Sequence, residues 1–250
     1  MNQSTVSALK VLLLVSLLPL TFGAPIYSPT CGTGSSNIPD ATIDGSGATI
    51  PGQFSCGVVI NLPGSVSAGN AVTVGLIGFS HEAIGDLIVT LTHYTDTTKT
   101  ATYGATQTLF YQVGKISNDP NDFGYGARFG DLFTADNYSF NSGFSSNLWT
   151  IASTLGTADL IPGASTGLGN YTTHGPLSAA VNNFSAMFVG QPLGGYWQLD
   201  ITDNAAGPSD PAVPGSLLQF SLDIATTTVP EPGSSGLALL GLIGLALWKR

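Results

Sequence analysis

Basic residues are scarce in this chain, and their scarcity excludes two classes of partner. Lys and Arg total six, and Lys10, Lys249 and Arg250 lie near the ends. Residues 24–228 keep three cations against fourteen acids, a net charge of −11. Stable binding of nucleic acid or of an anionic membrane surface needs clustered cations. We therefore expect a soluble acidic domain that binds no nucleic acid, and whose field favours divalent cations.

Helical periodicity is also lacking, and the regular segments alternate with period two instead. Three segments place apolar side chains on one face in this way: Asp86–Tyr94, Tyr196–Asp203 and Ser216–Ile224. Gly57–Leu62 and Ala71–Phe79 are further strand candidates. Strands near both ends of about 200 residues predict one all-β domain, a β-sandwich whose first and last strands are neighbours.

Segments rich in Gly, Asn and Asp separate these strands. Asn118–Phe144 is predicted to be a loop, Leu160–Gly175 to be irregular and Lys99–Val113 to be a return strand pair. Leu148–Ala152 is a brief apolar patch. Aromatic residues of the long loop could stack on sugar rings or fold inwards over the sandwich, and we favour the second: Phe123, Tyr125, Phe129, Phe133, Tyr138 and Phe140.

Cysteine is rare, with Cys31 and Cys56 the two in the chain. A zinc site is disfavoured because a second Cys/His pair does not lie nearby. Export to an oxidising compartment would favour a disulfide between them. That bond would join the N-terminal arm, residues 24–37, to the first strand.

Two long apolar runs lie at the ends of the chain. Met1–Gly23 has one early cation, an apolar run and small residues before Ala24, which is the pattern of a secretory signal peptide. Residues 226–236 form a linker, and residues 237–250 are apolar before the final Lys249-Arg250. Such a run resembles a transmembrane helix with a stop-transfer signal, although it is short for a span.

The linker contains Val229, Pro230, Glu231 and Pro232. This tetrapeptide, the apolar run and the basic end resemble the PEP-CTERM sorting signal of Gram-negative bacteria that produce exopolysaccharide. The resemblance implies export, a transient stay in the inner membrane and processing by an exosortase-type enzyme near the motif. The expected destination is the cell surface, the outer membrane or the extracellular matrix.

Residues 38–225 resemble a second family, the P domain (homo B domain) that follows the catalytic domain of proprotein convertases. The matching blocks occur in order: Ile38-Pro39-Asp40, Ser80–Leu87, Gly195–Leu199, Asp203–Gly207 and Leu217–Ile224. The resemblance implies a jelly-roll-like β-sandwich of about eight strands. It also implies a non-catalytic module, since P domains stabilise a neighbouring subtilisin-like protease. The blocks begin soon after the signal peptide and leave no room for that protease.

A nucleophile elbow is the strongest sign of an enzyme, and it is weak. Gly163-Ala164-Ser165-Thr166-Gly167 fits the G-x-S-x-G pattern, which needs a strand before it and a helix after it. Pro162 and Leu168-Gly169-Asn170 predict neither. We expect no catalytic residues, and we expect His81 to hydrogen-bond the turn before Asp86 rather than to act as a general base.

Calcium is the cofactor that the acidic residues favour. Asp86, Asp203, Asn204 and Asp210 lie at strand ends or in one loop, where carboxylate and amide oxygens suit Ca²⁺. Asp119, Asn121 and Asp122 form a second, weaker candidate. The alternative is that these residues form turns by bonding their own backbone.

The expected role is a structural or binding module of the envelope, with exopolysaccharide or a surface protein as partner. The alternative is an accessory domain of a secreted subtilisin-like protease, or a residual serine hydrolase.

Overall fold

The computed structural model describes most of the central chain. The described residues are 26–28, 31, 36–67, 69–100, 106–119, 122, 124–125, 128–129, 136–155, 159–205 and 215–227. Contacts divide the chain into residues 21–226 and a second unit made of residues 1–20 and 227–250. All of the second unit except Thr227 lies outside the described residues, and so do the predicted signal peptide, the motif Val229–Pro232 and the predicted helix of residues 237–250.

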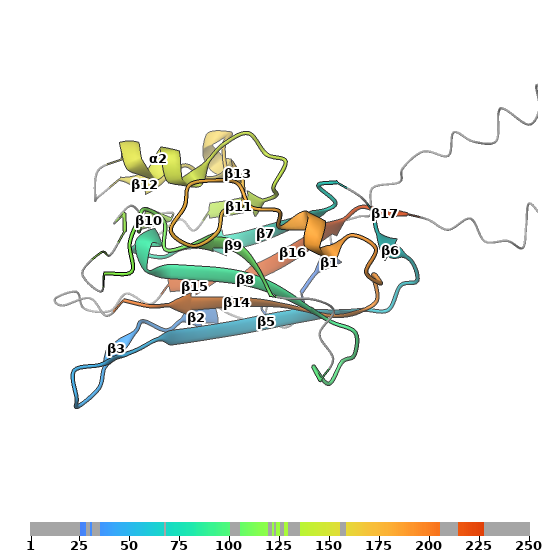
Figure 1. Cartoon of the computed structure of the whole chain (residues 1–250), viewed down its shortest axis with the longest axis horizontal. Helices are drawn as coiled ribbons and strands as arrows, with labels where there is room; N and C mark the ends of the chain where they lie inside the picture. Colours follow the sequence, from blue (N-terminus) through green and yellow to red (C-terminus); the bar gives the residue numbers. More distant parts are fainter. Residues whose placement is uncertain are drawn as a thin grey trace, which may run out of the picture. The chain divides into compact units, whose positions relative to one another are not determined.

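The described chain is mostly β, as predicted, and two sheets form its centre (Figure 1). One sheet has the order β5-β14-β8-β9, with bounds Gly52–Ile60, Gly195–Asp203, Leu87–Tyr94 and Gln107–Tyr111. The other has the order β1-β16-β7-β11-β13, with bounds Ile26–Tyr27, Gln219–Ile224, Val72–Phe79, Asp136–Phe140 and Asn170–Tyr171. All pairs in these sheets are antiparallel except β11 with β13.

Short two-stranded ribbons and helices complete the described part. The ribbons are β2 (Ser36–Ile38) with β15 (Gly215–Leu217), β3 (Thr42–Ile43) with β4 (Thr49–Ile50), β6 (Ser65–Val66) with β17 (Thr226–Thr227), and β10 (Arg128–Phe129) with β12 (Leu160–Ile161). The helices are η1 (Ile84–Asp86), α2 (Leu148–Thr154), η2 (Ala164–Thr166) and η3 (Ser185–Phe188). None of the helices in the described ranges is long and apolar enough to cross a membrane.

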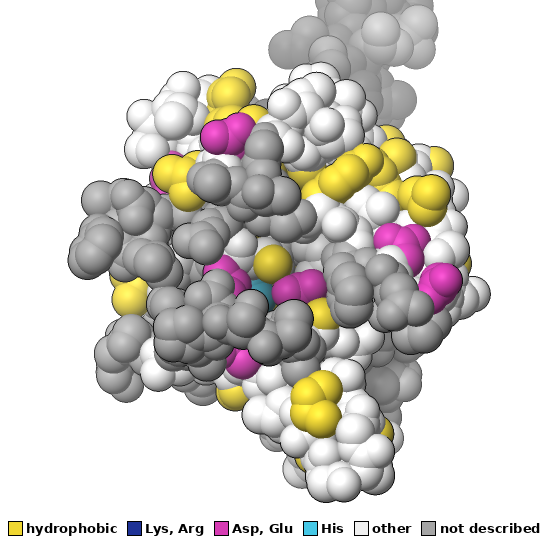
Figure 2. Space-filling view, turned by 90° about the vertical axis from the view of Figure 1, so that its left-hand side faces the viewer, with side chains coloured by type: hydrophobic (Ala, Val, Ile, Leu, Met, Phe, Trp, Pro, Cys, Tyr) yellow, Lys and Arg dark blue, Asp and Glu magenta, His cyan; other side chains and the backbone are white. Residues whose placement is uncertain are grey.

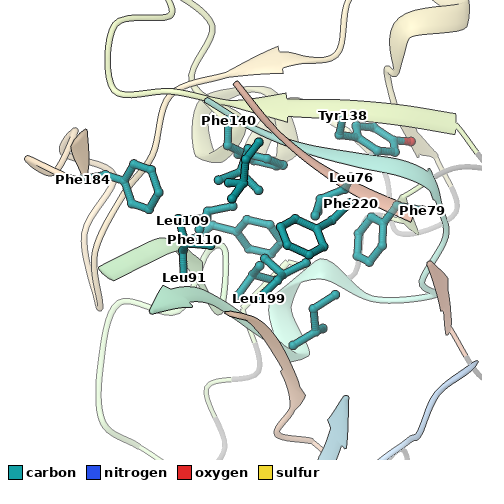
Figure 3. Packing of buried hydrophobic residues seen from close by; sticks show 14 of the residues in the cluster. Leu76, Phe79, Leu91, Leu109, Phe110, Tyr138, Phe140, Phe184, Leu199 and Phe220 are labelled. Carbon is teal, nitrogen blue, oxygen red and sulfur yellow. The ribbon is translucent and has the colours of Figure 1, made fainter. Parts of the chain in front are cut away.

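The core lies between the two central sheets and follows from the period-two pattern. Trp197, Leu199 and Ile201 of β14 are fully buried, while their neighbours along the strand are partly exposed. Figure 3 shows Leu76 and Phe220 of one sheet meeting side chains of the other. The rings of Phe110 in β9 and Phe140 in β11 lie 5.1 Å apart and join the two sheets.

Strands from the two ends of the domain pair with each other. β5 pairs with β14 along its whole length, from Gly52 opposite Asp203 to Ile60 opposite Gly195. β16 pairs with β7 in the other sheet. The disulfide between Cys31 and Cys56, with Cα atoms 5.6 Å apart, ties the N-terminal arm to β5.

Three predictions of local structure need correction, and a fourth is tested in part. The patch Leu148–Ala152 is helical, because it belongs to α2, which Asn147 caps by accepting a hydrogen bond from the Thr150 amide. The loop Asn118–Phe144 contains β11, whose Tyr138 and Phe140 are buried. Leu160–Gly175, predicted irregular, contains β12, η2 and β13. Of the strand pair predicted in Lys99–Val113, the structure describes β9; residues 101–105 lie outside the described residues, so the other strand stays a prediction.

Candidate metal centre

Asp40, His81 and Asp203 come together at the end of the sheet where β14 finishes. Asp203 is the last residue of β14, His81 follows β7 by two residues and Asp40 follows β2 by two. One possible ligand atom from each side chain lies within 4.8 Å of the other two. Figure 2 shows this end of the domain, with acidic side chains on either side of a histidine. The three residues offer two carboxylates and one imidazole.

Backbone contacts hold His81 in place. Its Nδ1 lies 3.0 Å from the carbonyl oxygen of Ala83 and 3.2 Å from the Ala83 amide nitrogen. A Cβ added to Gly215 would lie 2.5 Å from Cδ2 of the histidine, so the ring packs directly against the β15 backbone. The whole residue is 4 % exposed. The imidazole therefore has one orientation, with Nε2 directed away from the turn.

The Nε2 atom of His81 faces the carboxylate of Asp203. The distance from Nε2 to Oδ2 of Asp203 is 3.3 Å. Oδ1 of the same carboxylate accepts a hydrogen bond from the Ala205 amide at 3.1 Å, which fixes its rotation. Asp203 is 2 % exposed. A buried carboxylate needs a counter-charge, and protonated His81 or a metal ion could supply it.

Asp86 lies beside this cluster, and the charges of the cluster change its pKa. Its backbone carbonyl accepts a hydrogen bond from the Asn204 amide at 2.9 Å, where β14 leaves the sheet. The pKa of the Asp86 carboxyl is raised to about 7, first by burial and then by the negative charge of Asp203, while His81 lowers it. Acidic side chains are thus concentrated here beyond what His81 alone neutralises.

The residues predicted to bind calcium are partly brought together. Asp86, Asp203 and Asn204 adjoin one another, whereas Asp210 lies outside the described residues. Asp40 and His81 were not predicted as ligands. Asp40 is positioned by a close approach: a Cβ on Gly52 would lie 1.8 Å from the carbonyl oxygen of Pro39. The block Ile38-Pro39-Asp40 was the one sequence signal that could have included Asp40.

The second acidic candidate is a turn in its described part. Oδ2 of Asp122 accepts hydrogen bonds from the amides of Ile116 and Ser117 and from the Ser117 hydroxyl. Oδ1 of Asp122 accepts from the Gly124 amide. Asn121 lies outside the described residues. These bonds are those of a side chain that shapes its own loop.

Ser165 does not lie on a strand–turn–helix elbow. Its segment is η2, a single 3-10 turn between Gly163 and Gly167. The Ser165 hydroxyl donates to the carboxylate of Asp136, and its amide donates to the same group. The serine oxygen thus points to the Asp136 carboxylate, and these hydrogen bonds stabilise the turn.

The other two histidines are built into the core. His93 stacks on Trp197 with ring centroids 4.1 Å apart, and its nitrogens lie 3.2 Å from Gln191 Oε1 and from the Gly194 carbonyl oxygen. His174 is fully buried and meets the ring of Trp149 edge-on at 5.2 Å. Burial lowers the pKa of His174 to about 4, so it is neutral at pH 7.

Comparison with known proteins identifies the C-terminal end. A family model described as the PEP-CTERM protein-sorting motif matches residues 228–250. No curated protein matches the chain. A crystal structure of a serine protease of Aeromonas sobria is similar at 15 % identity and a TM-score of 0.33, covering 87 % of this chain and 29 % of that one.

A second solved structure is the complex of the same Aeromonas sobria serine protease with its chaperone ORF2. It is similar at 14 % identity and a TM-score of 0.32, covering 88 % of this chain and 30 % of that one. The chain thus spans less than a third of the length of the solved chains that it matches. The motif at residues 228–250 implies an exported protein that an exosortase-type enzyme sorts to the cell surface or outside the cell.

Proposed function

We propose that the chain is an exported, non-catalytic β-sandwich of P-domain type that serves as a structural or binding module of the envelope or exopolysaccharide layer. The observation that carries the proposal is the sorting motif at residues 228–250, which follows a compact acidic β domain in the sequence. The tail holds the chain in the inner membrane until processing releases it towards the cell surface, outer membrane or matrix.

The arrangement of the strands supports the P-domain assignment. The blocks that resemble that family, Ser80–Leu87 and Gly195–Asp203, lie far apart in the sequence. β8 begins at Leu87, the last residue of the first block, and β14 is formed by the second block. The two strands pair, with Asp203 opposite Leu87. Leu217–Ile224 provides β16, which pairs with β7 in the facing sheet. Segments that resemble one family at separate places in the sequence thus meet in the folded domain.

The hydrogen bonds of the histidines and of Ser165 support a non-catalytic role. A serine nucleophile needs a base within hydrogen-bond reach, and that base is in turn oriented by a third group. His81 has its Nδ1 on Ala83 and its Nε2 facing Asp203, so neither nitrogen is directed at a serine. The Ser165 hydroxyl donates a hydrogen bond to the Asp136 carboxylate.

We also propose that the domain binds a divalent cation at the end where β14 finishes. Calcium is the ion predicted from the carboxylate and amide side chains there, and Asp86, Asp203 and Asn204 are the described members of its predicted ligand set. Cation binding there would offset the repulsion between the two carboxylates. A bound ion would stabilise the folded domain by an amount that rises with the logarithm of its concentration over its dissociation constant.

The catalytic alternative is tested directly with the full chain, purified in detergent. The chain is incubated with casein and with a panel of fluorogenic peptides and esters, beside Ser165→Ala. We expect no turnover above buffer from either protein. Hydrolysis by the wild type that Ser165→Ala abolishes would overturn the non-catalytic assignment.

The binding role is tested by pull-down with exopolysaccharide isolated from the producing bacterium. We expect retention of the chain that competing free polysaccharide reverses. A neutral polymer such as dextran serves as the matched control. Equal retention on both, or on neither, would exclude the exopolysaccharide as the partner and leave a surface protein to be sought.

A further inference from the structure

We propose that Asp40, His81 and Asp203 form a binding site for a zinc-class transition metal, with Zn²⁺ as the ion of choice. This inference rests on side-chain geometry and is independent of the proposed role in the envelope. It shares Asp203 with the predicted calcium site and differs from it in the other two ligands, Asp40 and His81, and in the metal.

The first argument is the orientation of His81. Its Nδ1 lies 3.0 Å from the Ala83 carbonyl oxygen, to which it can donate, and 3.2 Å from the Ala83 amide nitrogen, from which it can accept. When Nδ1–H donates to that carbonyl, the neutral ring carries its lone pair on Nε2. Histidines that bind metals generally use their second nitrogen in this way, since the bond to a carbonyl fixes the tautomer and the ring orientation.

The second argument is the environment of Nε2. The His81 side chain is 1 % exposed, and Nε2 makes no hydrogen bond within the described part of the chain. The atom that it faces is Oδ2 of Asp203, at 3.3 Å. In this tautomer a lone pair would face a carboxylate oxygen, and a metal ion between the two atoms would make that arrangement favourable.

The third argument is the distance itself. Zinc–nitrogen and zinc–oxygen bonds are about 2.0–2.2 Å, so two ligands at a tetrahedral angle lie about 3.3 Å apart. The separation of Nε2 and Oδ2 equals that value. The Asp40 carboxylate lies within 4.8 Å of both other ligand atoms, so a small rotation of this partly exposed side chain would complete three protein ligands.

The chemistry of the donor set favours zinc over calcium. Calcium takes six to eight oxygen ligands, and imidazole is not among those it prefers. One imidazole and two carboxylates suit Zn²⁺, with a fourth position for water. The metal would also neutralise the excess of carboxylates, since Asp86 adds a further acid beside Asp203.

The rival reading is that His81 is protonated and forms a buried ion pair with Asp203. The two readings differ in what they require of Asp40. A metal site loses a ligand when Asp40 becomes Asn, whereas the His81–Asp203 pair keeps both of its members. Asp40→Asn is therefore the informative variant, and Asp159→Asn, at an exposed acid that belongs to neither candidate site, is its matched control.

The test uses the full chain in detergent, stripped with EDTA and desalted, with thermal unfolding to verify that every variant folds. Titration with Zn²⁺ against a chromophoric chelator should show one tight site per chain, and Co²⁺ should give the visible absorption of a tetrahedral N/O site. Zn²⁺ should raise Tm at concentrations at which Ca²⁺ does not. Asp40→Asn and His81→Gln should each weaken Zn²⁺ binding at least about 100-fold. Loss of a residue that only hydrogen-bonds a metal ligand would weaken it less.

Three results would overturn the proposal. Binding of neither ion would leave the His81–Asp203 ion pair alone. Calcium binding that Asp40→Asn weakens, without zinc binding, would make the centre an oxygen site. Zinc binding that neither variant weakens would place the metal elsewhere. Asp159→Asn should bind Zn²⁺ as the wild type does, and a matching loss in that variant would mean that general charge holds the metal.

Discussion

His174 is the residue whose titration should most affect stability in acid. It is fully buried, and burial lowers its pKa from 6.5 to about 4. The unfolded chain binds a proton near pH 6.5 and the folded chain only near pH 4, so stability is lost as the pH falls through this window. The loss from this group is about 3 kcal/mol. Urea unfolding curves at pH 7, 5.5 and 4 measure it.

The variant His174→Gln is the comparison that isolates this effect. It loses the contact with Trp149 and should be less stable than the wild type at pH 7. It has no proton to gain, so its stability should fall less in acid, and the two proteins should converge near pH 4. Parallel curves across the whole range would show that other groups cause the acid sensitivity.

The candidate centre shows how far single residues can be predicted from sequence. Asp86 and Asp203 were predicted as neighbours because each lies at the end of a period-two segment. His81 and Asp40 reach the same place through backbone packing against Gly215 and Gly52, positions where a Cβ would collide with its neighbours. Such contacts depend on the folded chain, and local sequence patterns do not encode them.

Among the elements, the helix α2 offers a clear measurement. The side chain of Asn147 accepts from the Thr150 amide at 3.1 Å and donates to the Ala179 carbonyl at 2.8 Å. Asn147→Ala should cost about 2 kcal/mol, since it removes an N-cap and a second hydrogen bond of about 1 kcal/mol each. Asn147→Asp keeps the cap and should cost about half as much. Midpoints of urea unfolding give both values, and equal losses would mean that the cap contributes nothing.

Strands were predicted better than the other elements, for a physical reason. Asp86–Tyr94 and Tyr196–Asp203 differ by one residue from β8 and β14, because one buried face imposes strict alternation along each. The helix α2 has seven residues, too few to show a helical period. β11 begins Asp136-Asn137, residues typical of turns, and pairing with β7 overrides that local preference.

At the scale of the whole molecule, the sorting signal and the candidate metal centre are encoded in the sequence in different ways. The sorting motif is a continuous segment, so it can be identified from the sequence alone and a family model matches it directly. The candidate centre is assembled from separate segments after β2, after β7 and at the end of β14. Export should therefore tolerate changes in the centre, and metal binding should tolerate changes in the tail.

Replacement of Val229, Pro230, Glu231 and Pro232 by Ala tests the address. The variant keeps the apolar run and the terminal Lys249-Arg250. These two cations favour an orientation in which the C-terminus stays on the cytoplasmic side of the membrane. In its producing bacterium, most of the variant should stay in the membrane fraction at full mass, whereas the wild type should lose the tail and reach the surface. Fractionation with intact-mass analysis measures both. A chain that ends at Thr228 is the control, and it should leave the membrane without processing. Release of the variant in the wild-type proportion would show that the tetrapeptide does not direct cleavage.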